Sequence, residues 1–443
     1  MSGFLHYFLS AIDPTANLGF SRALPELMSA TYVPWWLMYV VPVVIWFVPS
    51  LVCWLVYLVK PALIRRPLPA GEPRAAPFVS VVIAGRNEAA SIGQAIRAAL
   101  RCGYPHLEVI FVDDCSDDDS VAIARRAARS VTGSRSDTDR VRIFASPRRN
   151  GKASTLNIGI RMARGEFIAI IDADSAIQYG TMQHWLVPFA DPRVGAVCAN
   201  IRVLNSTASL LTRLQEIEYA MQFTVGRLGA ARIGLLPIIP GIGGLFKGEI
   251  LRRVGGFDTG LGDDTDMTMK LRKQRWKLDM SIDAIVWTIV PETRQHLWRQ
   301  RMRWERNMVK IRLSKHRDQF LLGRYGLANA FVALQLLFIR LTLPWMGLIG
   351  LLFITVVYGP LTVPRLLTDV YCIYLIFLLV KSLIARDLAH TPQPTNFWLL
   401  FVFPFYRLML RVPVMYAQFC ELFRIGAKHP YVPDHIWQEI PWW

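Results

Sequence analysis

The chain has 443 residues, with 53% hydrophobic residues, only 19% charged residues and a formal net charge of +17. Because soluble domains carry about 25% charged residues, this composition argues against a purely soluble protein, and the apolar content excludes a disordered one. The six cysteines lie far apart and form no CxxC pair, which indicates neither a disulfide scaffold nor a zinc ribbon.

An uncharged apolar run extends from Val33 to Val59. A helix needs about 20 apolar residues to cross a bilayer, so we expect a transmembrane helix here, preceded by an N-terminal segment of residues 1–32. Basic residues follow the run, beginning with Lys60, whereas the first thirty residues contain one basic residue, Arg22. The positive-inside bias therefore predicts that residues 1–32 lie outside and that the chain enters the cytoplasm near residue 60.

A linker rich in Pro and Gly, residues 60–77, leads to a more polar region, residues 78–320. In this region short apolar runs alternate with stretches of helical periodicity. The alternation predicts an α/β domain with a mainly parallel sheet, in which ligands bind at the carboxyl ends of the strands. The expected strands are residues 78–84, 108–112, 141–145 and 167–171, and the expected helices are residues 91–100, 116–130 and 153–163.

Acidic pairs follow two of these strands. Asp172 and Asp174 form a DxD motif, and alternate residues of an extended strand end point the same way, so both carboxylates can face one ion. Oxygen ligands favour Mg²⁺ or Mn²⁺, which substrate phosphates usually complete. Asp113 and Asp114 can accept hydrogen bonds from a nucleotide base or ribose. The alternative is that these are solvated turn or capping residues, which is the assignment we make for residues 117–119.

Two further motifs lie at expected helix starts. Lys152 ends a basic turn before a helix and is placed to meet a phosphate, with ordinary surface charge as the alternative. Asp263, Asp264 and Asp266 open the helical stretch 267–275. Three carboxylates so close together can act as a general base with its electrostatic neighbours; the alternative is a capped helix start.

The sequence QRMRW lies in a helical run from Arg294 to Arg317 that contains nine Lys and Arg residues against one acid. Gln300, Arg303 and Trp304 are spaced i, i+3, i+4 and so share one helix face. Arginine can grip a pyrophosphate with two hydrogen bonds, and an indole can stack on the flat face of a sugar. The alternative is a basic helix that lies on anionic lipid headgroups.

Residues 325–420 are again largely apolar and precede a C-terminal tail, residues 421–443. Because the last apolar stretch contains Arg407 and Arg411, it can span the membrane or lie in its interface. We therefore expect two or three transmembrane or interfacial helices here. The three apolar stretches are residues 327–358, 366–385 and 396–419.

Five motifs occur in one order along the chain and end in a helix that precedes the apolar region. In this order they resemble the membrane-bound processive family-2 glycosyltransferases, which include cellulose, chitin, hyaluronan and poly-N-acetylglucosamine synthases. The resemblance implies an inverting glycosyltransferase whose cytosolic GT-A domain, an α/β fold that binds nucleotide sugars, lies between N- and C-terminal transmembrane helices. The motifs are AGRNE (84–88), VDD (112–114), DAD (172–174), GDDTD (262–266) and QRMRW (300–304).

The resemblance also implies roles on the donor side of the site. Glu88 and one of Asp113 and Asp114 would hold the uridine. Asp172 would contact the nucleotide sugar, and Asp174 would bind the Mg²⁺ or Mn²⁺ that bridges the diphosphate. The physics agrees, because a leaving diphosphate needs its charge neutralised.

On the acceptor side, Asp264 aligns with the family's base and would take the proton of the attacking hydroxyl, with Asp263 beside it at the acceptor. Gln300, Arg303 and Trp304 would close over the pyrophosphate and line the acceptor site.

The chain departs from the family at Arg86, where an aromatic residue is common. Arginine can also stack on a base, so a donor-binding role for Arg86 is kept while the base preference is less defined. The segment 240–246 lies where the family's acceptor-contacting segment varies, and it does not match the version expected for cellulose.

The resemblance predicts polymerisation of a sugar from a UDP-sugar into a β-linked polysaccharide that is exported, with Arg340, Arg407 and Arg411 as candidates to line the path. UDP-N-acetylglucosamine is the first candidate donor and UDP-glucose the second. The alternative is transfer of one sugar to a lipid carrier.

The expected partners are the UDP-sugar donor, a growing glycan or lipid acceptor, and membrane lipids; export or regulatory subunits are not identified. Nucleic acid is not expected, because much of the basic excess lies beside membrane segments. The expected location is a bacterial cytoplasmic membrane, with several spans and the catalytic domain on the cytoplasmic side.

Overall fold

A computed structural model provides the structure, and its description covers most of the chain after residue 50. The expected segment 1–32 and most of the expected helix 33–59 lie outside the described residues, as do residues 424 and 426–443 of the tail. Residues 51, 52 and 54–59 are helical, at the end of that expected helix. The described residues are 51–52, 54–60, 64, 66–68, 76–132, 140–258, 263–321, 324–335, 340–389, 397–423 and 425.

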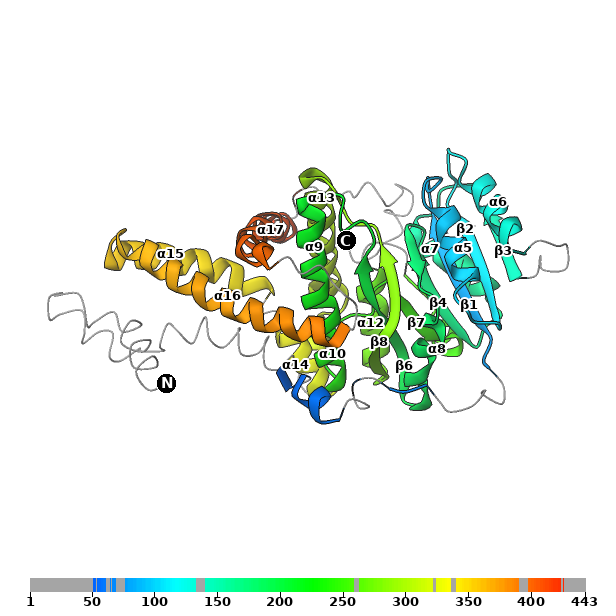
Figure 1. Cartoon of the computed structure of the whole chain (residues 1–443), viewed down its shortest axis with the longest axis horizontal. Helices are drawn as coiled ribbons and strands as arrows, with labels where there is room; N and C mark the ends of the chain where they lie inside the picture. Colours follow the sequence, from blue (N-terminus) through cyan, green and yellow to red (C-terminus); the bar gives the residue numbers. More distant parts are fainter. Residues whose placement is uncertain are drawn as a thin grey trace. The chain divides into compact units, whose positions relative to one another are not determined.

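Over the described residues, eight strands form one sheet in the order β3-β2-β1-β4-β7-β6-β8-β5 (Figure 1). The strands β3, β2, β1 and β4 run parallel, and so do β6 and β8, whereas β7 is antiparallel to β4 and β6, and β5 to β8. The sheet is therefore mixed, and the expected parallel character holds for its first half. The strands are β1 (Val79–Gly85), β2 (Leu107–Asp113), β3 (Val141–Ala145), β4 (Phe167–Asp172), β5 (Ser175–Ile177), β6 (Val194–Val203), β7 (Gly244–Lys247) and β8 (Lys277–Thr288).

The helices α5 (Ile92–Leu100) and α6 (Ser120–Thr132) share one core with the sheet, and α7 (Lys152–Met162) belongs to another. In β1, Val81 and Ile83 pack in the core of α5 and α6, while Val82 packs in the core of α7. Successive strand residues point to opposite faces, so a strand covered on both faces reads as one continuous apolar run. This explains why the run 78–84 identifies β1 from sequence.

The remaining helices include two that enter the site described below, α9 and α13. The hydroxyl of Ser209 accepts from the backbone of Thr212 at the start of α9, and Thr293 caps α13 in the same way. Both residues suit this because a short side-chain oxygen satisfies a free N–H of the first turn. The helices are α8 (Thr181–Leu186), α9 (Leu210–Tyr219), α10 (Arg227–Arg232), α11 (Gly248–Arg253), α12 (Asp263–Lys273), α13 (Arg294–Lys310), α14 (Leu327–Gln335), α15 (Leu343–Tyr358), α16 (Thr362–Ala389) and α17 (Trp398–Leu422).

Wider turns extend two of these helices. A π-helical segment, Ala220–Gly226, joins α9 to α10, and another, Ile311–Lys315, continues α13, so the expected helical run 294–317 is α13 plus this extension. A short 3-10 turn, Arg317–Phe320, follows, and a further one, Val187–Ala190, follows α8.

Three helical stretches of the described chain are long and apolar enough to cross a membrane: Leu327–Leu352, Leu367–Leu388 and Trp398–Leu422. The sequence predicts two or three transmembrane or interfacial helices in this region, and whether these helices cross a membrane stays a prediction. Large apolar side chains such as Leu352 and Phe405 are exposed on them. Contiguous exposed apolar surface of this kind marks a membrane or partner contact, so the helices suit a membrane-associated protein.

We predict that Gly159→Ala destabilises the protein, because an added methyl group would lie 2.4 Å from Cγ1 of Val82 where α7 packs on β1. The overpacking costs about 1–3 kcal/mol and exceeds the helix-propensity gain of about 1 kcal/mol. Thermal unfolding measures the difference. Gly226→Ala is the control, since its nearest new contact is an ordinary 3.4 Å; the prediction is wrong if both variants melt alike, or if Val82→Ala does not relieve Gly159→Ala.

Candidate functional site

Carboxylates converge at one edge of the sheet, where parallel strands end. Asp113 is the last residue of β2 and Asp172 the last of β4, and β1 lies between these strands. The register pairs Gly85 of β1 with Asp113, and Ala84 with Asp172. The structure therefore brings the VDD and DAD motifs to strand ends on either side of β1, at the carboxyl edge where the sequence predicts them.

Hydrogen bonds join the loops that follow β1 and β2. Arg86 donates from Nε to the carbonyl of Cys115 at 3.3 Å and from Nη2 to Asp117 at 2.7 Å. The backbone N–H of Glu88 donates to the Ser120 hydroxyl at 2.7 Å. Asn87 and Cys115 have φ values of 58° and 60°, a left-handed conformation that Asn tolerates better than most residues. The two loops thus form one unit beside the strand ends.

The expected helix start at residue 116 is wrong, because α6 begins at Ser120. The carboxylate of Asp118 accepts from the backbone N–H groups of Ser120 and Ala89, each at 3.0 Å. Asp117–Asp119 therefore precede the helix, and Asp117 and Asp118 hold the loop after β1 instead of only facing solvent.

Asp113 and Asp114 are both buried and accept backbone N–H groups. Asp113 accepts from the N–H of Ser116 at 3.0 Å and from its hydroxyl. Asp114 accepts from the N–H groups of Asn150 at 2.6 Å and Gly151 at 2.9 Å. These bonds are typical of turn-stabilising aspartates, and those of Asp114 hold the turn that precedes Lys152.

Lys152 begins α7 and lies against the DxD motif. Its Nζ donates to Oδ1 of Asp172 at 2.6 Å, and both side chains remain partly exposed. An ammonium group at a helix start, beside the strand-end carboxylates, is placed to contact an anionic group that enters from solvent. The position of Lys152 is therefore compatible with the contact to a donor phosphate that the sequence predicts.

Negative charge is concentrated around Asp174. Burial, together with the carboxylates of Asp172 and Glu88, raises the pKa of Asp174 to about 6, against the opposing effects of the Ser175 hydroxyl and the Lys152 ammonium. Burial likewise raises the pKa of Glu88, with Asp172 among the contributors. A bound cation would relieve this repulsion, because opposite charge favours the ionised carboxylates.

The described residues contain no group of three or more His, Cys, Asp and Glu side chains arranged to hold a metal ion. The DxD pair nevertheless fits a divalent cation of the Mg²⁺ type, which takes one or two carboxylates and completes its shell with water and phosphate oxygens.

Asp264 reaches the same region from the far side of Gly241. Asp263 begins α12, and the carboxylate of Asp264 accepts from the N–H of Thr265 at 2.7 Å. A Cβ on Gly241 would lie 3.8 Å from Cβ of Asp264 and 4.0 Å from Nζ of Lys152. The helix begins four residues earlier than residue 267, so these acids belong to its first turn.

Asp266 does not act as an electrostatic neighbour of Asp264, the candidate base. It is buried and accepts from His316 Nε2 at 2.7 Å and from Lys315 at 2.6 Å. Burial opposes ionisation, but His316, Lys270 and Lys315 lower the pKa of Asp266 to about 2. The side chain is therefore an internal ion-pair partner that ties α12 to the extension of α13.

The QRMRW motif lies on α13, and its residues differ in burial. Gln300, Arg303 and Trp304 are half-buried, whereas Arg301 is buried and pairs with Glu218 of α9. The guanidinium of Arg301 lies 4.6 Å from the ring centre of Trp304. The sequence prediction of a shared face did not include Arg301, whose role depends on a partner 83 positions away.

The sequence analysis did not identify two further residues, Tyr219 of α9 and Arg227 of α10. The pKa of Tyr219 rises to about 12 because the residue is buried, and Arg301, Arg227 and Asp174 all act on it electrostatically. Burial lowers the pKa of Arg227, and Asp264 is among the groups that oppose this. Tyr219 is thus within electrostatic reach of both the QRMRW helix and the DxD motif, and no sequence pattern marks it.

The charged residues within the C-terminal helices also have partners. Arg407 of α17 lies 2.9 Å from Glu218, and Arg340 lies 3.6 Å from Glu305 of α13. These pairs account for both charges through helix docking, and the export path that they were expected to line stays a prediction.

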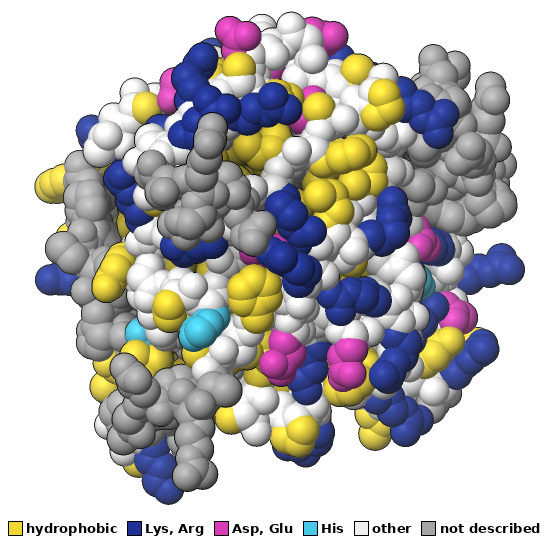
Figure 2. Space-filling model, turned by 90° about the vertical axis from the view of Figure 1, so that its right-hand side faces the viewer, with side chains coloured by type: hydrophobic (Ala, Val, Ile, Leu, Met, Phe, Trp, Pro, Cys, Tyr) yellow, Lys and Arg dark blue, Asp and Glu magenta, His cyan; other side chains and the backbone are white. Residues whose placement is uncertain are grey.

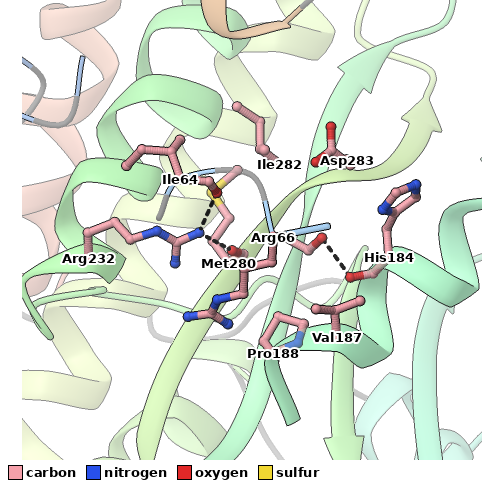
Figure 3. Close-up of a pocket in the computed structure, with 10 residues that line it drawn as sticks. Ile64, Arg66, His184, Val187, Pro188, Arg232, Met280, Ile282 and Asp283 are labelled. Carbon is pink, nitrogen blue, oxygen red and sulfur yellow. Dashed lines mark hydrogen bonds between the residues drawn. The ribbon is translucent and has the colours of Figure 1, made fainter. Parts of the chain in front are cut away.

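A separate hollow lies at the opposite edge of the sheet (Figure 3). It is near the start of β8, which runs in the same sense as β4, so it is remote from the strand-end carboxylates. Arg232 donates to the carbonyls of Ile64 and Met280, and both Arg66 and Arg232 pair with Asp279. The hollow therefore marks where the segment after residue 60 docks on the domain.

Lys and Arg side chains predominate on the face of the molecule that Figure 2 shows. On α6, for example, Arg125, Arg126 and Arg129 are exposed. A basic surface raises the local concentration of anionic ligands.

Comparison with known proteins gives a family match over the middle of the chain. The description "Glycosyltransferase like family 2" matches residues 75–307, which contain all five motifs. A poly-beta-1,6-N-acetyl-D-glucosamine synthase of Staphylococcus epidermidis is 30% identical over 228 residues, which are 51% of this chain and 53% of that protein. The probable glycosyltransferase YdaM of Bacillus subtilis (strain 168) is 31% identical over 235 residues, 52% of this chain and 55% of that protein. The chain thus spans about half the length of the curated relatives it matches.

A solved structure confirms the expected fold. The mannosyltransferase PcManGT from Pyrobaculum calidifontis, in complex with GDP-Man and Mn²⁺, superposes with a TM-score of 0.60 at 22% identity, covering 87% of this chain and 98% of that chain. At this identity the likeness concerns the fold alone.

We predict that Gly241→Ala keeps the fold but lowers activity. The new methyl group would make only ordinary contacts of 3.8 and 4.0 Å, yet it would lie beside both Asp264 and Lys152, where we expect the substrate to bind. Thermal unfolding should be unchanged, whereas turnover should fall by about 10–100-fold. Unchanged turnover would show that the space beside Gly241 is not used.

Proposed function

Since the chain belongs to glycosyltransferase-like family 2, we propose that this glycosyltransferase polymerises a sugar from a UDP-sugar donor into a β-linked polysaccharide and exports it. The observation that carries the proposal is the placement of Asp264, Lys152 and the DxD motif around Gly241. A base, a phosphate-binding cation and a metal-binding pair at one point are what sugar transfer from a nucleotide requires.

On the donor side, Arg86, Glu88 and the loop fixed by Asp113 and Asp114 would hold the nucleotide. Asp172 would contact the nucleotide sugar, and Lys152 would contact the diphosphate when it leaves Asp172. A divalent cation held by Asp174, Mg²⁺ or Mn²⁺, would supply positive charge against the diphosphate.

In the transfer step, Asp264 would accept the proton of the acceptor hydroxyl while that oxygen forms a bond to the anomeric carbon. The bond between this carbon and the diphosphate oxygen breaks from the opposite face, so the configuration inverts and UDP leaves. Arg303 and Lys152 would stabilise the negative charge that develops on the leaving group. Asp263, Gln300 and Trp304 would orient the acceptor sugar.

Polymer synthesis is supported by the names of relatives at about 30% identity, poly-beta-1,6-N-acetyl-D-glucosamine synthases, so UDP-N-acetylglucosamine is the first candidate donor. In addition, the apolar helix α17 packs directly on the QRMRW helix, so a product that leaves the acceptor site could pass to the membrane region. We infer a bacterial cytoplasmic membrane as the location. The second candidate function is single transfer to a lipid carrier, which the same contact would also allow.

The test is release of the nucleoside diphosphate by the purified full chain in detergent, with Mg²⁺ or Mn²⁺: UDP from UDP-N-acetylglucosamine or UDP-glucose, and GDP from GDP-mannose. We expect release from one UDP-sugar together with a high-mass, glycosidase-sensitive product. Chelation by EDTA should abolish release, and added Mn²⁺ should restore it. Release without polymer would favour the lipid-carrier reaction, whereas release that survives EDTA would contradict the metal assignment.

We predict that Asp264→Asn lowers transfer by about 10²–10⁴-fold, the usual contribution of a general base, while UDP still binds as in the unmodified protein. Calorimetry measures the binding and UDP release measures the transfer. Asp191→Asn is the matched control, because it removes the same charge beside the start of β6, at the opposite edge of the sheet. Normal turnover in Asp264→Asn would refute the base assignment.

A further inference from the structure

Glu218 of α9 is a buried carboxylate that three side chains from other helices contact. Its side chain is 1% exposed. Arg301 of α13 donates to it twice, at 3.1 and 2.8 Å. From α17, the hydroxyl of Tyr406 donates at 2.6 Å and Nη1 of Arg407 at 2.9 Å. One carboxylate therefore joins the QRMRW helix to the last apolar helix.

The charges of this cluster depend on one another. Burial would raise the pKa of Glu218, but Arg301 and Arg407 outweigh it and hold the pKa below its usual value. Burial would lower the pKa of Arg301, and Glu218 reverses this as well. Loss of the carboxylate's charge would leave two guanidinium groups close together without compensation, a costly arrangement in a buried site.

The geometry extends from Glu218 to Trp304. The paired hydrogen bonds fix the plane of the Arg301 guanidinium, because a guanidinium and a carboxylate match in a fork geometry. The same guanidinium lies 4.6 Å from the ring centre of Trp304, within the range of a cation–π contact. The position of the indole thus depends on a carboxylate that does not itself reach the site.

The contacts of the apolar helix α17 with the domain are also specific. Tyr406 and Arg407 join α17 to Glu218 of α9. The same helix contacts α13 through Gln418, which donates to Glu305 at 2.8 Å, and through Glu421, which accepts from Arg306 at 2.6 Å. Among these contacts, the one at Glu218 also involves Arg301, whose guanidinium lies against the Trp304 ring. A shift of α17 would therefore be transmitted to the motif through this carboxylate.

We propose that Glu218 is a positioning residue that sets Trp304 for the acceptor sugar and couples it to the docking of the apolar helix α17. The inference rests on the proposed role of Trp304 in acceptor binding. It assigns to the Arg301–Glu218–Arg407 cluster a function in transfer in addition to stability, so that displacement of α17 lowers turnover while the nucleotide site is unaffected.

The domain contains a matched control in Glu108, near the start of β2. Glu108 is fully buried and accepts from the Ser80 hydroxyl at 2.6 Å, from Arg142 at 2.7 Å and from Nε of Arg164 at 3.1 Å. This cluster has the same composition of one carboxylate, two guanidiniums and one hydroxyl. It lies at the opposite end of β2 from Asp113, so its loss should affect stability without affecting Trp304.

The experiment compares Glu218→Gln, Glu108→Gln and Glu421→Gln in the full chain. Incorporation of 5-fluorotryptophan gives a ¹⁹F signal for each tryptophan, and the Trp304 signal is identified by its absence from Trp304→Phe. We expect Glu218→Gln to shift the Trp304 signal, to lower transfer by about 10–100-fold and to leave the affinity for UDP unchanged. Glu218→Asp, which keeps the charge, should recover part of the transfer.

Glu108→Gln should lower the melting temperature without shifting the Trp304 signal, and Glu421→Gln should shift it less than Glu218→Gln. Should Glu218→Gln not fold, Tyr406→Phe removes one hydrogen bond, keeps both ion pairs and should give a smaller shift and loss of the same kind. The proposal is overturned if the Trp304 signal stays in place in these Glu218 or Tyr406 variants, or if Glu108→Gln reproduces their kinetic loss. The ¹⁹F comparison is independent of turnover, so inactivity of the unmodified chain with every donor would refute the proposed function separately.

Discussion

The parallel register of β2, β1 and β4 is the constraint on which the site depends. Parallel strands end at the same edge, so the aspartates that terminate β2 and β4 must lie on either side of the end of β1. This brings acidic residues to one edge, where burial first, and then the carboxylates of Asp172 and Glu88, raise the pKa of Asp174. The ammonium of Lys152 neutralises part of this negative charge, and a bound metal ion would neutralise more of it. The same concentration of charge that opposes folding therefore prepares the site for its ligand.

Acidic residues around this edge serve two purposes. Those that accept backbone N–H groups, such as Asp114 and Asp118, hold the loops in place, and those that are left toward solvent, such as Asp172, remain available to a substrate. Asp266 shows the first purpose in α12, where it is buried against Lys315 and His316 while Asp264, two residues earlier, lies near Gly241. Adjacent acids in one motif thus differ in role because a helix turns them toward different neighbours.

The catalytic domain and the apolar helices are joined by ion pairs as well as by apolar packing. Glu218 and Glu305 lie in the domain, and Arg407 and Arg340 lie in the apolar region. A charge within an apolar helix is costly unless it is paired, and these pairs form only when the helices dock on the domain. The pairing therefore favours one docked arrangement, in which α17 lies on the QRMRW helix, and it connects this helix directly to the apolar helices.

The sequence by itself determined the strands β1 to β4, the position of the acidic motifs at strand ends and the apolar character of the C-terminal helices, whose number it left at two or three. The strands were predictable because a strand covered on both faces is a continuous apolar run, and the helices because each is a long apolar stretch. The sequence also indicated the family, since five motifs occur in order. Tertiary structure alone decided the reversal of β5 and β7, the late start of α6 at Ser120, the inward role of Asp266 and the cluster at Glu218. These depend on partners far along the chain, such as Arg301 for Glu218. No local pattern records which distant side chain will neutralise a buried charge, so only the folded packing of α9, α13 and α17 could establish it.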